Sequence, residues 1–292
     1  MLTKIRWFVV IFCVLAGNSM AQESFADGEK LLRNGEIVEA KKVFLNYEHQ
    51  AEAKEYLGDI ASFNKEWDQA IDYYEDLVDQ YPENAMYNFK LGGAMGMKAY
   101  YGPKIQAAIL LPDIKKYLKK AAELDPKHKE TRRALVELYM QIPGFIGGSK
   151  TIAESYASDL DRLNEVDALL ADAYIFKIQE YRDLARNKYE EAIRLAVRKP
   201  ELLTRNYLKY ELGEAAAIFE IRLSEGKKLL QEYISDYGYK DLKSPAWAHL
   251  RLAQIERIQN NQQAALTHIE KSLAINPEFD KALIEKQKIQ RL

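Results

Sequence analysis

A pattern of small and large apolar residues with a period of about 34 residues constrains the fold of this chain more than any other feature. The clearest unit begins at Tyr56-Leu57-Gly58 and ends at Tyr81-Pro82. Between these ends, small and large residues alternate at Ala61, Trp67, Ala70, Tyr74 and Leu77. Small residues allow two antiparallel helices to cross closely, and large residues fill the next layer. The pattern therefore predicts a stack of helical hairpins.

The same pattern returns near the end of the chain. This unit contains Leu252-Ala253, Ala265 and Ile269, and it closes with Ile275-Asn276-Pro277. The proline stops the second helix and sets the turn into the next element. Weaker matches begin near Gly28, Leu91, Leu135, Leu170 and Leu212. We therefore predict about seven hairpins in residues 22–277, with the clearest repeats at residues 51–84 and 244–277.

Residues 278–292 are predicted to form a capping helix. Phe279, Leu283 and Ile289 lie on one apolar stripe, while charged residues occupy most other positions. Such a helix covers the last open apolar face of a stacked array. We predict that residues 22–292 form a single solenoid domain, in which residues 237–245 are a weak joint.

The composition agrees with a folded, all-helical protein. Only 8 Pro and 14 Gly occur in 292 residues, and 48% of the residues are hydrophobic. A disordered chain would be far less apolar. The net charge of −2 gives no strongly basic surface, so nucleic acid is not an expected partner.

Residues 1–21 are predicted to be a cleaved secretory signal peptide. Lys4 and Arg6 precede an apolar run that is about half the length of a membrane span, and Ala21 ends a cleavage motif. Asn18 stands where a lipoprotein signal would have its cysteine, which disfavours lipidation. The single cysteine, Cys13, would leave with the signal, so no disulfide is expected. The exported protein is expected in the periplasm, with secretion as the other possibility, and without a membrane span.

The motif residues of the two clearest units resemble those of the tetratricopeptide repeat (TPR) family, and the resemblance covers almost all of residues 22–292. It implies an all-α, right-handed superhelical solenoid of antiparallel helix pairs, with about seven units plus a C-terminal capping helix. In that family the first helices line a concave groove that usually binds a peptide or a protein. The insert at residues 143–150 resembles a loop of exported bacterial members.

The resemblance also implies which side chains face the groove. They lie at the second, fifth, ninth, twelfth and thirteenth places of each first helix, where aromatic residues and methionines alternate with carboxylates. The candidate residues are Asp59, Phe63, Phe89, Met97, Glu137, Met140, Asp172, Phe176, Tyr207, Tyr210, Glu214 and Trp247. This mixture favours an extended or helical partner with apolar anchors and some basic groups. The alternative is that the aromatic residues only bury against the next repeat.

No catalytic residue, cofactor or metal site is predicted. The four histidines, His49, His128, His249 and His268, do not lie at metal-ligand spacing. Residues 144–151 read GFIGGSKT, but Ser149 replaces the glycine before the lysine and a helix, not a strand, precedes them. This segment is interpreted as a glycine-rich turn in which Ser149 caps the next helix. We therefore expect a protein that is not an enzyme.

The sequence is compatible with three functions. The leading hypothesis is a scaffold of the bacterial cell envelope that binds a protein or peptide in its groove. The alternative is a helical-repeat protein that binds a small molecule or glycan, because Tyr and Trp rings stack on sugars. The third is a helper subunit of an enzyme. The sequence identifies neither the partner nor the oligomeric state.

The apolar insertion at residues 99–112 has two interpretations. It lengthens the two helices, which we prefer, or it forms a lid.

Overall fold

The computed structural model describes residues 24–292. This part of the chain contains 15 α-helices, two short 3-10 helices and no strand. The predicted signal peptide lies outside the described residues. Among the residues that the structure describes, no helix combines the length and the apolar character that crossing a membrane requires.

The helices pair in chain order into seven hairpins, followed by one further helix. The bounds are α1 Phe25–Arg33, α2 Ile37–Leu45, α3 Ala51–Phe63, α4 Trp67–Gln80, α5 Ala85–Tyr101, α6 Lys104–Leu124, α7 Lys129–Gln141, α8 Lys150–Leu160, α9 Glu165–Ile178, α10 Arg182–Arg198, α11 Tyr207–Phe219, α12 Leu223–Ser235, α13 Pro245–Ile258, α14 Gln262–Ile275 and α15 Asp280–Ile289. The two 3-10 helices are Gly144–Ile146 and Pro200–Leu202.

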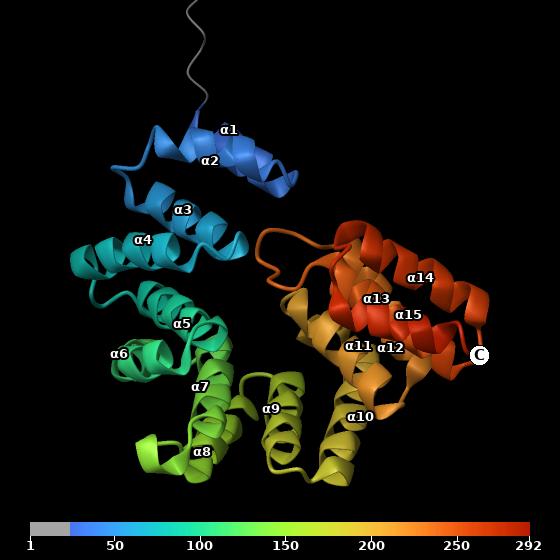
Figure 1. Cartoon of the computed structure of the whole chain (residues 1–292). Helices are drawn as coiled ribbons and strands as arrows, with labels where there is room; N and C mark the ends of the chain where they lie inside the picture. Colours follow the sequence, from blue (N-terminus) through green and yellow to red (C-terminus); the bar gives the residue numbers. More distant parts are fainter. Residues whose placement is uncertain (1–23) are drawn as a thin grey trace, which may run out of the picture.

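Successive hairpins follow one another along an arc from α1 to α14 (Figure 1). Each second helix packs against the first helix of the next hairpin, and α15 packs against α13 and α14. The structure is therefore the all-α, TPR-like solenoid that the repeat pattern predicts, with a final helix against the last hairpin.

Close helix crossings depend on the small residues of the repeat. A Cβ atom added to Gly58 would lie 2.5 Å from Cε1 of Tyr74, and one added to Gly213 would lie 2.4 Å from Cγ of Leu230. Ala70, Ala253 and Ala265 have no exposed surface. The predicted pairing of small with large residues at the crossings is thus confirmed.

The insertion at residues 99–112 lengthens two helices. α5 has 17 residues and α6 has 21, with Pro112 inside α6. This confirms the preferred interpretation over a lid. Tyr100, Ile105 and Ile109 at the tips of these helices are 67%, 78% and 70% exposed.

The glycine-rich turn is also as predicted. The Ser149 hydroxyl accepts a hydrogen bond of 3.3 Å from the backbone N–H of Ile152 and caps α8. Lys150 forms an ion pair with Glu154, one turn further along the same helix, at 3.1 Å. Gly147 adopts a left-handed conformation with φ of 92°, which favours glycine at this position.

Candidate partner-binding groove

Residues 236–244, here called the bridging loop, join α12 to α13 and reach back toward the end of α3 (Figure 1). The ring centroids of Tyr237 and Phe63 lie 6.2 Å apart, and Tyr239 packs against the apolar cluster of α1, α2 and α3. Buried Asp241 holds the loop by accepting hydrogen bonds from Asn206 Nδ2 and from the backbone N–H of Gly238. The predicted weak joint therefore contacts the first two repeats, at the predicted groove residue Phe63.

A cavity of about 110 Å³ lies between α7, α9, α10 and α11, and is called the central cavity below. It is lined by Glu137, Tyr174, Lys177, Tyr189, Tyr207, Glu211, Glu214, Ala215, Ile218 and Phe219. Three of these residues, Glu137, Tyr207 and Glu214, belong to the predicted groove set. They come from the fourth and sixth hairpins, so the superhelix brings together residues that no local spacing connects.

A buried ionic network lies against the central cavity. The Arg133 guanidinium on α7 donates to Glu211 on α11 at 2.6 Å and to Asp167 on α9 at 3.4 Å. Arg205 donates to the same Asp167 at 2.5 and 3.0 Å. The Asp167 side chain is fully buried and that of Arg133 is 6% exposed. This network fixes α7, α9 and α11 relative to one another.

Several polar groups at the cavity lack an internal partner. Tyr189 is only 4% exposed, and its hydroxyl forms no hydrogen bond within residues 24–292. Oε2 of Glu211 is buried and likewise unpartnered among the described residues. Burial, together with the Glu211 carboxylate, raises the pKa of Glu137 even though Arg133 is near. Burial and the nearby carboxylates also raise the pKa of Tyr189 and Tyr207 far above the ordinary tyrosine value.

Most of the remaining predicted groove residues contact other residues of the helical stack. Two are acidic and have basic or hydroxyl partners: Asp59 accepts hydrogen bonds from Lys90 and Tyr74, and Asp172 pairs with Lys188. Two are aromatic and pack on other rings: Phe89 packs on His128, and Trp247 packs on Phe279. Met97, Met140 and Phe176 are half-buried. For Phe89 and Trp247, packing within the repeats is the contact observed.

The prediction for Tyr210 is wrong. This ring has no exposed surface, because it packs between Tyr207 and Tyr233 with centroid distances of 5.8 and 5.3 Å. Its hydroxyl donates a hydrogen bond of 2.8 Å to Glu214. Tyr210 therefore supports the groove residue Glu214 instead of meeting a partner.

Comparison with solved structures identifies the architecture. A tetratricopeptide repeat protein from Parabacteroides merdae ATCC 43184 superposes with a TM-score of 0.52 at 12% identity, covering 91% of this chain and 97% of that chain. Yeast Tom70 superposes with a TM-score of 0.55 at 19% identity, covering 93% of this chain and 59% of that chain. The chain has the tetratricopeptide repeat fold.

A chain of the APC/C hetero-tetramer Cut9-Hcn1 gives a TM-score of 0.55 at 15% identity, covering 91% of this chain and 48% of that chain. No protein-family model and no curated protein matches the sequence. At these identities the structural likeness concerns the fold alone.

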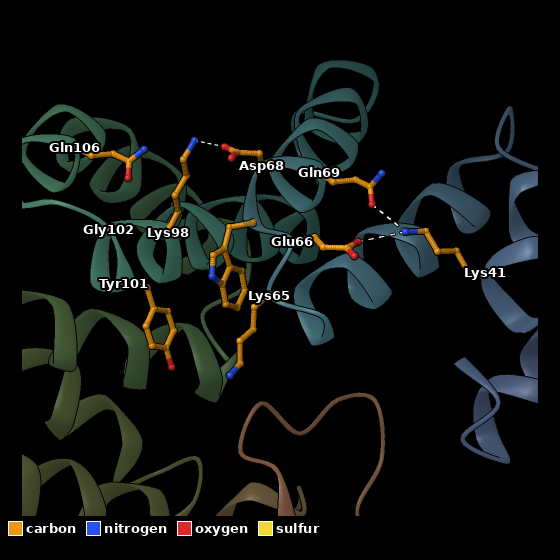
Figure 2. Close-up of a pocket in the computed structure, with 10 residues that line it drawn as sticks. Lys41, Lys65, Glu66, Asp68, Gln69, Lys98, Tyr101, Gly102 and Gln106 are labelled. Atoms are coloured by element: carbon orange, nitrogen blue, oxygen red, sulfur yellow. Dashed lines mark hydrogen bonds and ion pairs between the residues drawn. The ribbon is translucent and has the colours of Figure 1, made fainter. Parts of the chain in front are cut away.

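A second and larger cavity, of about 670 Å³, lies beside Trp67 at the edge of the TPR stack (Figure 2). The rings of Trp67 and Tyr101 are nearly parallel, with an interplanar angle of 8° and centroids 6.2 Å apart. Lys41 donates to Glu66 and Gln69 on its wall, and Lys98 pairs with Asp68 (Figure 2). The sequence pattern missed this Trp67 cavity because Trp67 is a repeat position and Tyr101 belongs to the insertion.

The last TPR hairpin brings two histidines together. Nδ1 of His249 on α13 lies 3.3 Å from Nδ1 of His268 on α14. Burial, followed by the charge of His268 and of Lys271, lowers the pKa of His249 to about 4. Within the described part of the chain, no group of three or more His, Cys, Asp or Glu side chains is placed to hold a metal ion.

Proposed function

We propose that this protein is a non-enzymatic scaffold of the bacterial cell envelope that holds a protein or peptide segment along the inner face of its helical stack. The fold supports a scaffold, because stacked helix pairs present an extended inner surface to partners. The support for the envelope is the signal-like pattern of residues 1–21.

The observation that carries the proposal is the central cavity. Three first helices, α7, α9 and α11, place Glu137, Tyr174 and Tyr207 around one opening, although these residues belong to three successive hairpins. The buried network of Arg133 and Asp167 fixes this arrangement, so the surface is formed before a partner arrives. A preformed polar and aromatic recess offers both affinity and orientation to a bound segment.

Affinity capture from bacterial envelope extracts tests the proposal. The wild-type protein should retain one protein in stoichiometric amount, and Glu137→Arg should release it while leaving thermal unfolding nearly unchanged. Glu154→Arg on α8 is the matched control, because Glu154 is exposed and does not line the cavity. Capture that is equal for all variants, or the absence of a stoichiometric partner, would contradict groove binding.

The Trp67 cavity supports a second candidate, a glycan or small-molecule binder. Two nearly parallel aromatic rings beside lysine, carboxylate and amide groups are the side chains that stack on sugars and bind their hydroxyl groups. Oligosaccharides should then raise the melting temperature of the wild type but not of Trp67→Ala. An unchanged melting temperature across an oligosaccharide panel would exclude this candidate.

A further inference from the structure

The ionic groups around the central cavity are not balanced. The network contains the carboxylates Glu130, Glu137, Asp167, Glu211 and Glu214, and the guanidinium groups Arg133, Arg205 and Arg251. The negative charges of Asp167 and Glu214 are compensated, because an arginine donates hydrogen bonds of 3.1 Å or less to each carboxylate. Glu137 forms one ion pair, with Arg133 at 3.7 Å, and the charges of Arg205 and Lys177 act on it from further away. With Lys177 counted, five carboxylates face four cations, so the cavity keeps a small excess of negative charge.

Two groups at the same place lack hydrogen-bond partners. The Tyr189 hydroxyl belongs to a side chain that is 96% buried in the cavity wall, since its exposure is 4%. Oε2 of Glu211 is a buried acceptor with no donor in the described residues. An unmet acceptor in a low-dielectric position is costly unless a donor is supplied from outside the chain.

The walls of the cavity suit a cation rather than a neutral polar group. Tyr174, Tyr189 and Tyr207 line the cavity together with the carboxylates of Glu137, Glu211 and Glu214. Ring faces attract ammonium and guanidinium groups, and carboxylates form their strongest hydrogen bonds with the same groups. The volume of about 110 Å³ is smaller than a benzene-binding cavity of about 150 Å³, so it admits the end of one side chain and not a folded segment.

We propose that the central cavity binds the cationic end of a lysine or arginine side chain carried by the partner. The carboxylates of Glu137 and Glu211 accept hydrogen bonds from the cation, Tyr189 orients it through its hydroxyl, and the tyrosine rings form the walls. This inference rests on the proposed function for the source of the side chain, but the cation site is tested without a partner.

Lys177 is the chain's own cation at this cavity. Its side chain is exposed, and its ammonium forms no ion pair with any described residue. An unpaired ammonium at the mouth of an acidic cavity competes with an incoming cation. Removal of this charge should therefore strengthen binding, which distinguishes a cation site from a purely apolar recess.

The test uses single amino-acid probes and NMR titration of the protein with labelled tyrosine rings. Nα-acetyl-lysine methylamide and the arginine analogue should shift the tyrosine signals of the cavity and bind at least tenfold more tightly than the Nε-acetylated lysine probe. Glu137→Gln should weaken binding of the charged probes at least fivefold, and Lys177→Gln should strengthen it at least twofold. Glu154→Gln is the matched control and should leave the affinity unchanged, because Glu154 does not line the cavity.

The outcomes separate this inference from the proposed function. Equal binding of the charged and Nε-acetylated probes, or an unchanged affinity in Glu137→Gln, would overturn the cation site while partner capture could still succeed. Binding of the charged probes with the expected variant effects would support the cation site even if no protein partner were captured. Tyr189→Phe provides a second variant that keeps the ring in the core and should weaken binding at least twofold.

Discussion

The guanidinium of Arg133 on α7 donates a hydrogen bond of 2.6 Å to Glu211 on α11, although 78 residues separate them in the sequence. Asp167 on α9 lies in the same network and is fully buried. A buried ion pair contributes little compared with an apolar contact, but removal of one partner leaves an uncompensated charge. The network therefore makes the geometry of three hairpins depend on a few side chains.

Substitution Asp167→Ala should lower the free energy of unfolding by about 3–5 kcal/mol, because Arg133 and Arg205 lose their shared buried partner. Urea unfolding followed by circular dichroism measures this change. Glu154→Gln breaks an exposed ion pair with Lys150 and should cost less than about 0.5 kcal/mol. A loss below about 1 kcal/mol for Asp167→Ala would mean that the network does not hold the repeats together.

The helix crossings give a matched pair of glycine substitutions. Gly58→Ala should destabilise the protein by about 1–3 kcal/mol, because the new Cβ would lie 2.5 Å from the Tyr74 ring. Gly93→Ala in α5 should stabilise it by about 0.5–1 kcal/mol, because no atom lies within 4 Å of the new Cβ and alanine favours the helix. Thermal unfolding of the two variants should shift in opposite directions. If both variants shift the melting temperature in the same direction, contact with the neighbouring helix does not determine the effect of the added Cβ.

The bridging loop gives a third prediction. Tyr237→Ala combined with Tyr239→Ala removes the two rings that contact Phe63 and the cluster of α1 to α3. We expect faster amide hydrogen exchange in residues 236–244 and at the end of α3, with exchange in α7 unchanged. Tyr100→Ala, which removes a ring that is 67% exposed, is the control and should change neither. Unaltered exchange in the double variant would mean that the loop does not stabilise the first repeats.

The sequence predicts the helix pairs well because their signals are local. Gly58 and Tyr74 lie on adjacent helices of one hairpin, so the spacing within about 34 residues is sufficient to place them. The final helix, the lengthened α5 and α6, and the Ser149 cap also depend on neighbouring residues.

The groove was harder to predict because it depends on how each helix is rotated in the stack. In α11, the predicted groove residue Tyr210 is buried, while its neighbour Glu211 lines the cavity. The predicted residues Tyr207 and Glu214 of the same helix do line the cavity. One residue corresponds to a rotation of about 100° on a helix, so Tyr210 faces the core although Glu211 beside it faces the cavity. On α10, Tyr189 is buried in the core and also lines the cavity. Arg133 and Glu211 lie on different hairpins, and only the superhelical stacking of the repeats brings them into contact.

The histidine pair of the last hairpin is surrounded mainly by positive charge. Burial is the largest cause of the lowered pKa of both rings, and Lys271 lowers the pKa of each further. Lys227 on α12 lowers the pKa of His268, whereas Glu256 on α13 raises it. The two Nδ1 atoms lie 3.3 Å apart, so one ring donates to the other, and burial together with the positive neighbours disfavours protonation of the pair.

This pair should make stability depend on pH. Because the folded pKa of His249 is about 4, below the ordinary value of 6.5, the unfolded chain takes up the proton first as the pH falls. The stability contribution is complete above pH 6.5 and is lost between pH 6.5 and 4, by about 1–2 kcal/mol because the rings are only half-buried. Urea unfolding of His249→Gln should lose less stability over this interval than the wild type, whereas His49→Gln, at an exposed position, should follow the wild type. If the free energy of unfolding falls equally with pH in His249→Gln and in the wild type, the histidine pair does not control the pH dependence of stability.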